Sequence, residues 1–139
     1  MFKNILLPVD LSDKHGRAMD AAADLVRQGG GEVTLLHVVE VIAGLSLDEE
    51  KAFYTRLGKV AQGHLKSLGD HLGQRQVSWR AEVLFGSRGP EVVRFAKEKG
   101  FDLIVLTSPR VEPDAPPSGW GSLSYKIGIM SPCPVLLVK

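Results

Sequence analysis

Short apolar segments alternate along the chain with longer segments whose apolar residues recur every three or four positions. The most apolar segments are Phe2–Val9, Glu32–Val39, Phe101–Leu106 and Val135–Val138. A short apolar run that ends at turn residues is typical of a strand buried on both faces of a sheet. The segment Val77–Phe85 instead alternates between apolar and polar residues. This pattern predicts one more strand, the third along the chain, nearer the edge of the sheet.

Helices are predicted between these strands. The first has Ser12 or Asp13 as its N-cap and ends at the triple glycine 29–31. The second is long and keeps one face apolar. It begins near the acidic residues 48–50, whose charge favours a helix N-terminus, and it ends at Gly73.

The last third of the chain predicts two shorter helices around an irregular segment. Pro90 is expected as the first helical residue, because the first turn of a helix does not use its N–H groups, and Gly100 ends that helix. Residues 107–120 contain four prolines and predict a surface loop. A short final helix is expected from Gly121.

This order of strands and helices predicts an α/β fold with a doubly wound, five-stranded parallel sheet and helices on both faces. In such folds the first strand is usually central. We expect one domain over residues 1–139, since the chain has no internal repeat and its Pro-rich loop is too short to link two domains.

Charge and hydropathy argue against two classes of partner, nucleic acids and membranes. The chain has 17 Lys and Arg against 16 Asp and Glu, with no basic block, which argues against a nucleic-acid partner. No apolar run approaches the roughly 18 residues that span a bilayer. Pro8 and Asp10 come too early for the apolar region of a signal peptide. We therefore expect a cytoplasmic protein without a membrane partner.

Asp10 is the first candidate binding residue. Open parallel sheets bind ligands outside the carboxyl ends of their strands, where the strand order reverses, and Asp10 ends the first strand. Its carboxylate is suited to accept hydrogen bonds from ribose hydroxyls. It is equally suited to cap the following helix, and the residues alone leave both interpretations open.

The start of the last helix is a second candidate. Gly121 and Ser122 open this helix, and Ser124 follows within its first turn. Unpaired N–H groups, two hydroxyls and the helix dipole together favour an anion. Simple capping of the helix would explain the same residues.

Four segments, in order and over almost the whole chain, resemble the universal stress protein family. They are residues 1–25, VTLLHVV at 33–39, VLFGSRGPEVVRFAKEKGFDLIVL at 83–106 and GSLSYKIGIMSPCPVLLVK at 121–139. The last segment is the most specific, because its Gly-Ser, Ser124, Lys126 and Cys-Pro-Val match the family spacing without a gap. The resemblance implies a single universal stress protein-like domain with an adenine nucleotide alpha-hydrolase-like fold, commonly dimeric through the last strand.

Many members of the family bind ATP through a glycine pattern that this chain lacks. The pattern is Gly, two residues, Gly, nine residues, Gly, then Ser or Thr. With Gly121 and Ser122 as its end, the first two glycine positions hold Ser108 and Val111. Glycine lets a backbone adopt positive φ beside a phosphate, and a β-branched residue resists this conformation. The prolines of the loop also remove N–H donors.

The remaining ligand positions of the family are retained. By resemblance, Asp10 would contact the ribose, and the backbone near Val9 and Val38 would contact adenine. Gly121, Ser122 and Ser124 would contact the phosphates. ATP or AMP is therefore the candidate ligand, although some family members without the glycine pattern do not bind ATP.

Two functional hypotheses follow. The first is a homodimeric, non-catalytic stress-response module with weak or no ATP binding, which uses its Pro-rich loop to contact an unidentified protein partner. The alternative is a switch in which ATP or AMP, bound through Asp10 and Gly121–Ser122, changes that loop. The short strand Val135–Val138 is expected to pair edge to edge in the homodimer.

The other reactive side chains predict no metal site and no catalytic centre. His64 and His71 are two helical turns apart, which is too far for both to bind one metal ion. Cys133 has no second cysteine to form a disulfide with. His37 lies nearest the expected binding site, at the end of a strand. No nucleophile elbow, Walker loop or Rossmann glycine pattern is present.

Overall fold

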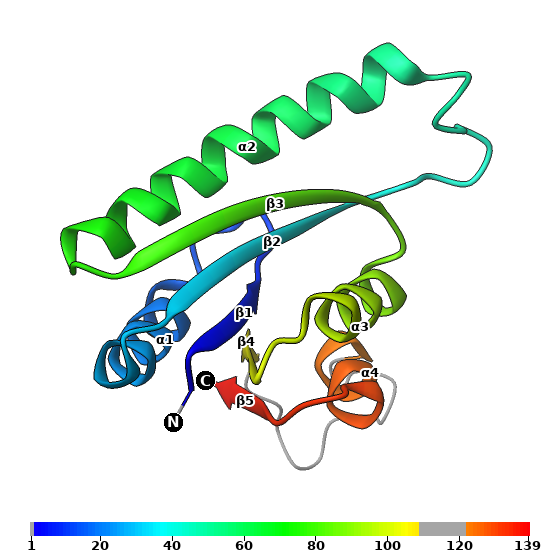
Figure 1. The fold of residues 1–139 in the computed structure, drawn as a ribbon. Coiled ribbons are helices and arrows are strands. Elements are labelled where there is room, and N and C mark those ends of the chain that lie inside the picture. The colour runs from blue at the N-terminus through cyan, green and yellow to red at the C-terminus, as the bar shows by residue number, and fades with distance from the viewer. Residues whose placement is uncertain (1, 109–121) are drawn as a thin grey trace.

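A computed structural model describes residues 2–108 and 122–139 and contains one five-stranded parallel sheet (Figure 1). The strand order is β3-β2-β1-β4-β5, so β1 is central and β3 and β5 are the edges, as predicted. The strands are β1 (Asn4–Pro8), β2 (Glu32–Glu40), β3 (Ser78–Gly86), β4 (Leu103–Thr107) and β5 (Val135–Val138).

Helices cover both faces of the sheet, which confirms the predicted doubly wound arrangement (Figure 1). The helices are α1 (Gly16–Gly29), α2 (Lys51–Gln74), α3 (Arg88–Lys99) and α4 (Ser122–Met130). Helices α1 and α2 pack on one face, while α3 and α4 pack on the other. No helix in the part of the chain that the structure describes is both long enough and apolar enough to cross a membrane.

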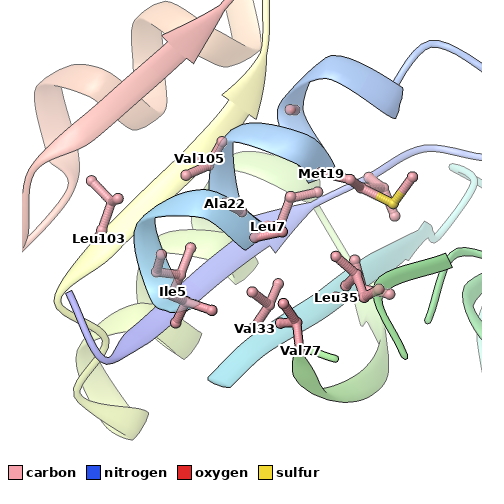
Figure 2. Close-up of a cluster of buried hydrophobic side chains, with 14 of the residues drawn as sticks. Ile5, Leu7, Met19, Ala22, Val33, Leu35, Val77, Leu103 and Val105 are labelled. Atoms are coloured by element: carbon pink, nitrogen blue, oxygen red, sulfur yellow. The ribbon is translucent and has the colours of Figure 1, made fainter. Parts of the chain in front are cut away.

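The core consists of two clusters, one on each side of the sheet, because alternate residues of a strand point to opposite faces. In β1, Ile5 and Leu7 face α1 and α2, whereas Leu6 faces α3 and α4. Figure 2 shows the first cluster, in which Met19 and Ala22 of α1 contact the strands. Both faces of β1 are thus fully buried, which explains its continuous apolar sequence.

Three predicted boundaries are wrong. Helix α1 begins at Gly16 with His15 as its N-cap, not Ser12 or Asp13. The loop between β1 and α1 is therefore longer than predicted. It is closed by the contact of the Asp10 carboxylate with the His15 ring. Helix α3 begins at Arg88, so Pro90 is its third residue, still within the turn that needs no N–H donor.

The third wrong boundary is at Thr107, which was expected to begin the irregular loop. It instead ends β4 and pairs with Val138 of β5. The Ser108 N–H then donates to the Val138 carbonyl at 2.8 Å, which extends the pairing by one more residue. The rest of the predicted loop, residues 109–120, lies outside the described residues.

Gly31 is required where the chain enters β2. A Cβ atom at this position would lie 2.0 Å from the Lys3 carbonyl oxygen, which is backbone and cannot move aside. The Glu32 N–H donates to the same carbonyl at 2.8 Å. The close approach of the two chain segments thus sets the start of the β1–β2 pairing.

We predict that Gly31→Ala destabilises the protein by about 1–3 kcal/mol, because the added methyl group must push the two segments apart. Urea unfolding measures this change in free energy. Gly63→Ala is the matched control, since a Cβ at Gly63 on α2 meets open space and alanine favours a helix. Equal stability of the two variants would contradict the prediction.

Candidate functional site

The candidate site lies at the carboxyl end of the sheet, where β1 has β2 on one side and β4 on the other. The chain reverses its direction of winding between these neighbours, which makes this the switch point at which such sheets bind ligands. The Val9 N–H donates to the Leu36 carbonyl at 2.8 Å, so the β1–β2 pairing continues up to the site. The chain leaves the sheet at Asp10.

The predicted residues Val9, Asp10, Val38 and Ser124 line one cavity of about 80 Å³. They come from the end of β1, from β2 and from α4, which are far apart in the sequence. Apolar side chains form most of the remaining wall: Pro8, Leu36, Val92, Leu106 and Leu123. Gly121 and the Ser122 side chain lie outside the described part of the structure, although Ser122 begins α4.

The Asp10 carboxylate is held by the loop that follows it. Its Oδ1 atom accepts hydrogen bonds from the Ser12 N–H at 2.9 Å and from His15 Nε2 at 2.8 Å. Burial alone would raise the pKa of Asp10, but these hydrogen bonds outweigh it and lower the pKa of this carboxyl well below its usual range. Asp10 is therefore a fixed anion that stabilises the turn and does not cap α1.

His15 was not among the predicted site residues. Its ring is buried, with 6% exposure, and its Nδ1 atom lies 2.7 Å from the Thr107 hydroxyl. Because the Asp10 carboxylate can only accept, Nε2 of His15 carries a proton. The Asp10 N–H also lies 3.2 Å from Nε2. A protonated Nε2 cannot accept a hydrogen bond from it. The ring thus connects the end of β1 to the end of β4.

His37 was expected at the end of a strand near the site, but it lies within β2 and does not line the cavity. Its Nδ1 donates to the Val9 carbonyl at 2.9 Å, and its side chain is buried. The Val9 N–H is already bonded to Leu36. The Val9 backbone therefore offers a ligand only the second lone pair of its carbonyl oxygen.

Arg88, the first residue of α3, also lines the cavity. Its Nε donates to Glu40 at 2.9 Å, and both side chains are about half exposed. An exposed ion pair of this kind contributes little to stability. Arg88 is therefore free to exchange this carboxylate for an anionic ligand at small cost.

The chain belongs to the universal stress protein family, whose family model matches residues 1–139. Universal stress protein YxiE of Bacillus subtilis is 30% identical over an alignment of 149 positions, gaps included, which covers the full length of both chains. Universal stress protein G of Escherichia coli O157:H7 is 33% identical over 117 residues, which cover 78% of this chain and 80% of the relative.

Solved structures confirm the fold. Universal stress protein UspA from Lactobacillus plantarum has a TM-score of 0.81 at 22% identity, with 99% of this chain and 98% of that chain covered. A universal stress protein from Archaeoglobus fulgidus, solved in complex with dAMP, has a TM-score of 0.73 at 18% identity and the same two coverages. At such identities the likeness shows the shared fold alone.

Side chains that bind metals do not gather anywhere in residues 2–108 and 122–139: no group of three or more His, Cys, Asp or Glu is placed to hold an ion. His71 instead lies 3.4 Å from Asp20, on the surface. Cys133 is a partly buried thiol near the hydroxyl of Ser131.

We predict that His15→Ala costs about 2 kcal/mol, because it removes two partly buried hydrogen bonds, and that the pKa of Asp10 rises toward its ordinary value. An ionised Asp10 stabilises the fold above its unfolded pKa, and this contribution is lost as the pH falls through the lower folded pKa. The variant should therefore lose less stability than the wild type on acidification below about pH 4.

Chemical denaturation at several pH values and an NMR titration of the Asp10 carboxyl measure these two effects. His71→Ala is the matched control, because this ring is about half exposed and its only partner in the described structure is the exposed Asp20. An unchanged pKa of Asp10 in the His15 variant would contradict the assigned hydrogen bond.

Proposed function

We propose that this protein is a non-catalytic regulatory module of the stress response that binds adenine nucleotides weakly. The observation that carries the proposal is the cavity in which Asp10, Val38 and Ser124 meet at the switch point of the sheet. A fixed carboxylate beside an apolar cavity suits a ribose next to a flat base. Asp10 Oδ1 is occupied by the loop, so Oδ2 is the atom available to the ribose hydroxyls.

Ligands of related proteins support an adenine nucleotide. The Archaeoglobus fulgidus protein binds dAMP, and two further solved members of the fold, each with a TM-score of 0.73, hold cAMP and AMP. These ligands share adenine, a five-membered sugar and one phosphate. We therefore place the adenosine part of the ligand in the cavity, with Asp10 at the ribose.

Two features support weak rather than tight binding. The cavity of about 80 Å³ is small beside the roughly 300–1,000 Å³ typical of ligand sites, so the base must displace lining side chains. Ser108 stands at the first glycine position, and its N–H is already bonded to Val138. That N–H is therefore not available to a phosphate.

The acid–base groups of the cavity support a non-catalytic role. Asp10 has a lowered pKa, which makes it a poor proton acceptor at neutral pH. His15 Nε2 is committed to Asp10, and Nδ1 lies beside the Thr107 hydroxyl. Neither residue is placed to activate water for hydrolysis of a phosphate.

We predict that titration calorimetry detects adenosine and AMP, and that Asp10→Asn weakens adenosine binding about tenfold, the effect of losing a charged hydrogen-bond acceptor. Asparagine keeps an oxygen for Ser12 and His15, so the loop should persist. Binding of 2′,3′-dideoxyadenosine, which has no ribose hydroxyls, should not change.

Asp13→Asn is the matched control, because Asp13 is an exposed carboxylate in the same loop but does not line the cavity. No heat with adenosine, AMP or ATP from the folded protein would refute nucleotide binding. It would instead favour the hypothesis of a nucleotide-independent interaction module.

We further propose a homodimer through β5. This four-residue strand is an edge of the sheet, and its Leu136 and Leu137 are 38% and 43% exposed. Next to it along the chain, α4 exposes about two-thirds of three large apolar side chains: Tyr125, Ile129 and Met130. Pairing with a second copy would complete the edge strand and cover apolar surface.

We predict that the wild type has twice the chain mass by light scattering and that Leu136→Lys shifts it toward the monomer, because a lysine at the interface would bury an unpaired charge. Val60→Lys is the control, since Val60 is 60% exposed on α2, away from β5. A monomeric wild type, or an unchanged mass of the Leu136 variant, would rule out this dimer.

A further inference from the structure

We propose that the phosphate groups of the nucleotide bind in a second cavity, on the α1 side of Asp10. This inference rests on the proposed nucleotide function. The cavity has a volume of about 560 Å³ and lies between the β1–α1 loop, the start of α1 and the ends of β4 and β5.

Three cationic side chains line this cavity: Lys14, Arg17 and Lys139. The hydroxyl side chains of Ser12, Thr107 and Ser108 also line it. Lys139 Nζ donates to the Ser108 hydroxyl at 3.0 Å, which places its charge at the wall. Cations and hydroxyl donors on one concave surface are the groups that bind phosphate.

The charge of the cavity is unbalanced. Asp10 is the only acidic side chain in its described lining, and Asp10 already accepts from Ser12 and His15. Within residues 2–108 and 122–139, Lys14 and Arg17 form no ion pair, whereas Arg75, Arg80, Arg88 and Arg94 all do. Cationic side chains therefore outnumber acidic ones in the described lining, and Lys14 and Arg17 are the two that an anionic ligand would neutralise.

The two cavities are neighbours. Asp10, His15 and Thr107 line both of them, so they form a common wall. A ribose on Asp10 lies at this wall, and its 5′ oxygen can point into the second cavity. The phosphates then need neither the missing glycines nor the Ser108 N–H, which is bonded to Val138.

Titration calorimetry with adenosine, AMP, ADP and inorganic pyrophosphate tests this placement. In the wild type, we expect affinity to rise from adenosine to AMP to ADP, and this gain to shrink as salt concentration increases. The variant Lys14→Glu/Arg17→Glu should lose at least about tenfold in ADP affinity, since two charged contacts become repulsive, while adenosine affinity stays unchanged.

Arg56→Glu/Lys59→Glu is the matched control. It reverses the same two kinds of charge at the same spacing of three residues, on the exposed surface of α2. It should leave the affinities of all four ligands within about twofold of the wild type, because surface charges beyond a Debye length are screened. An equal loss of ADP affinity in both variants would show a general charge effect and overturn the inference.

The remaining outcomes separate the inference from the proposed function. Two outcomes overturn the placement of phosphates in the second cavity but leave the proposed function standing. In one, adenosine binds but phosphate groups add no affinity. In the other, the gain in affinity from phosphate groups survives in the Lys14/Arg17 variant. Pyrophosphate binding without adenosine binding overturns both, and it identifies a site for free phosphate instead. Loss of the ADP gain in the Lys14/Arg17 variant alone, with adenosine affinity retained, supports the inference.

Discussion

The His15 ring holds together the part of the structure on which the proposed function depends. Through Asp10 and Thr107 it connects the ends of β1 and β4, the two strands between which the winding of the sheet reverses. The sheet pairing extends only one residue past the ends of β1 and β4, through the Val9 and Ser108 N–H groups, and neither bond joins the two strand ends to each other. A buried imidazole with a partner at each nitrogen supplies that connection, and it holds the Asp10 carboxylate at the wall between the two cavities.

In the proposed site, Asp10 combines a structural and a binding role because a carboxylate has two oxygens. Oδ1 is used by the loop, which lowers the pKa of Asp10 and keeps it charged, while Oδ2 remains for a ligand. The surrounding groups divide the site by chemistry. Apolar side chains such as Val38 predominate on the α3 and α4 side, where Arg88 is the one cation of the described lining, and Lys14, Arg17 and Lys139 lie on the α1 side. A ligand with a flat base at one end and negative charge at the other matches this division.

The sequence predicted the strands, the sheet edges and the helix ends better than it predicted the site. Continuous apolar runs identify buried strands. Gly30 and Gly100, which have positive φ, mark the ends of α1 and α3. Both signals depend only on residues close together in the sequence. Asp10 was recognisable from its place after β1. The role of His15 was not, since it depends on a loop conformation and on Thr107, which is 92 residues away. The same loop explains why Ser12 and Asp13 were wrongly expected to cap α1.

In the two proposals above, the last strand links dimerisation with nucleotide binding, two equilibria that would otherwise be independent. β5 supplies the exposed edge for a second copy of the chain, and it runs directly into Lys139 at the wall of the second cavity. Val138 belongs to that edge strand, where it pairs with Thr107, and it also lines the cavity. Association that orders β5 would then change nucleotide affinity, and nucleotide would change the dimer affinity by the same factor. The occupancy of the site would depend on how much of the protein the cell contains, so that a rise in its abundance acts as a signal in its own right.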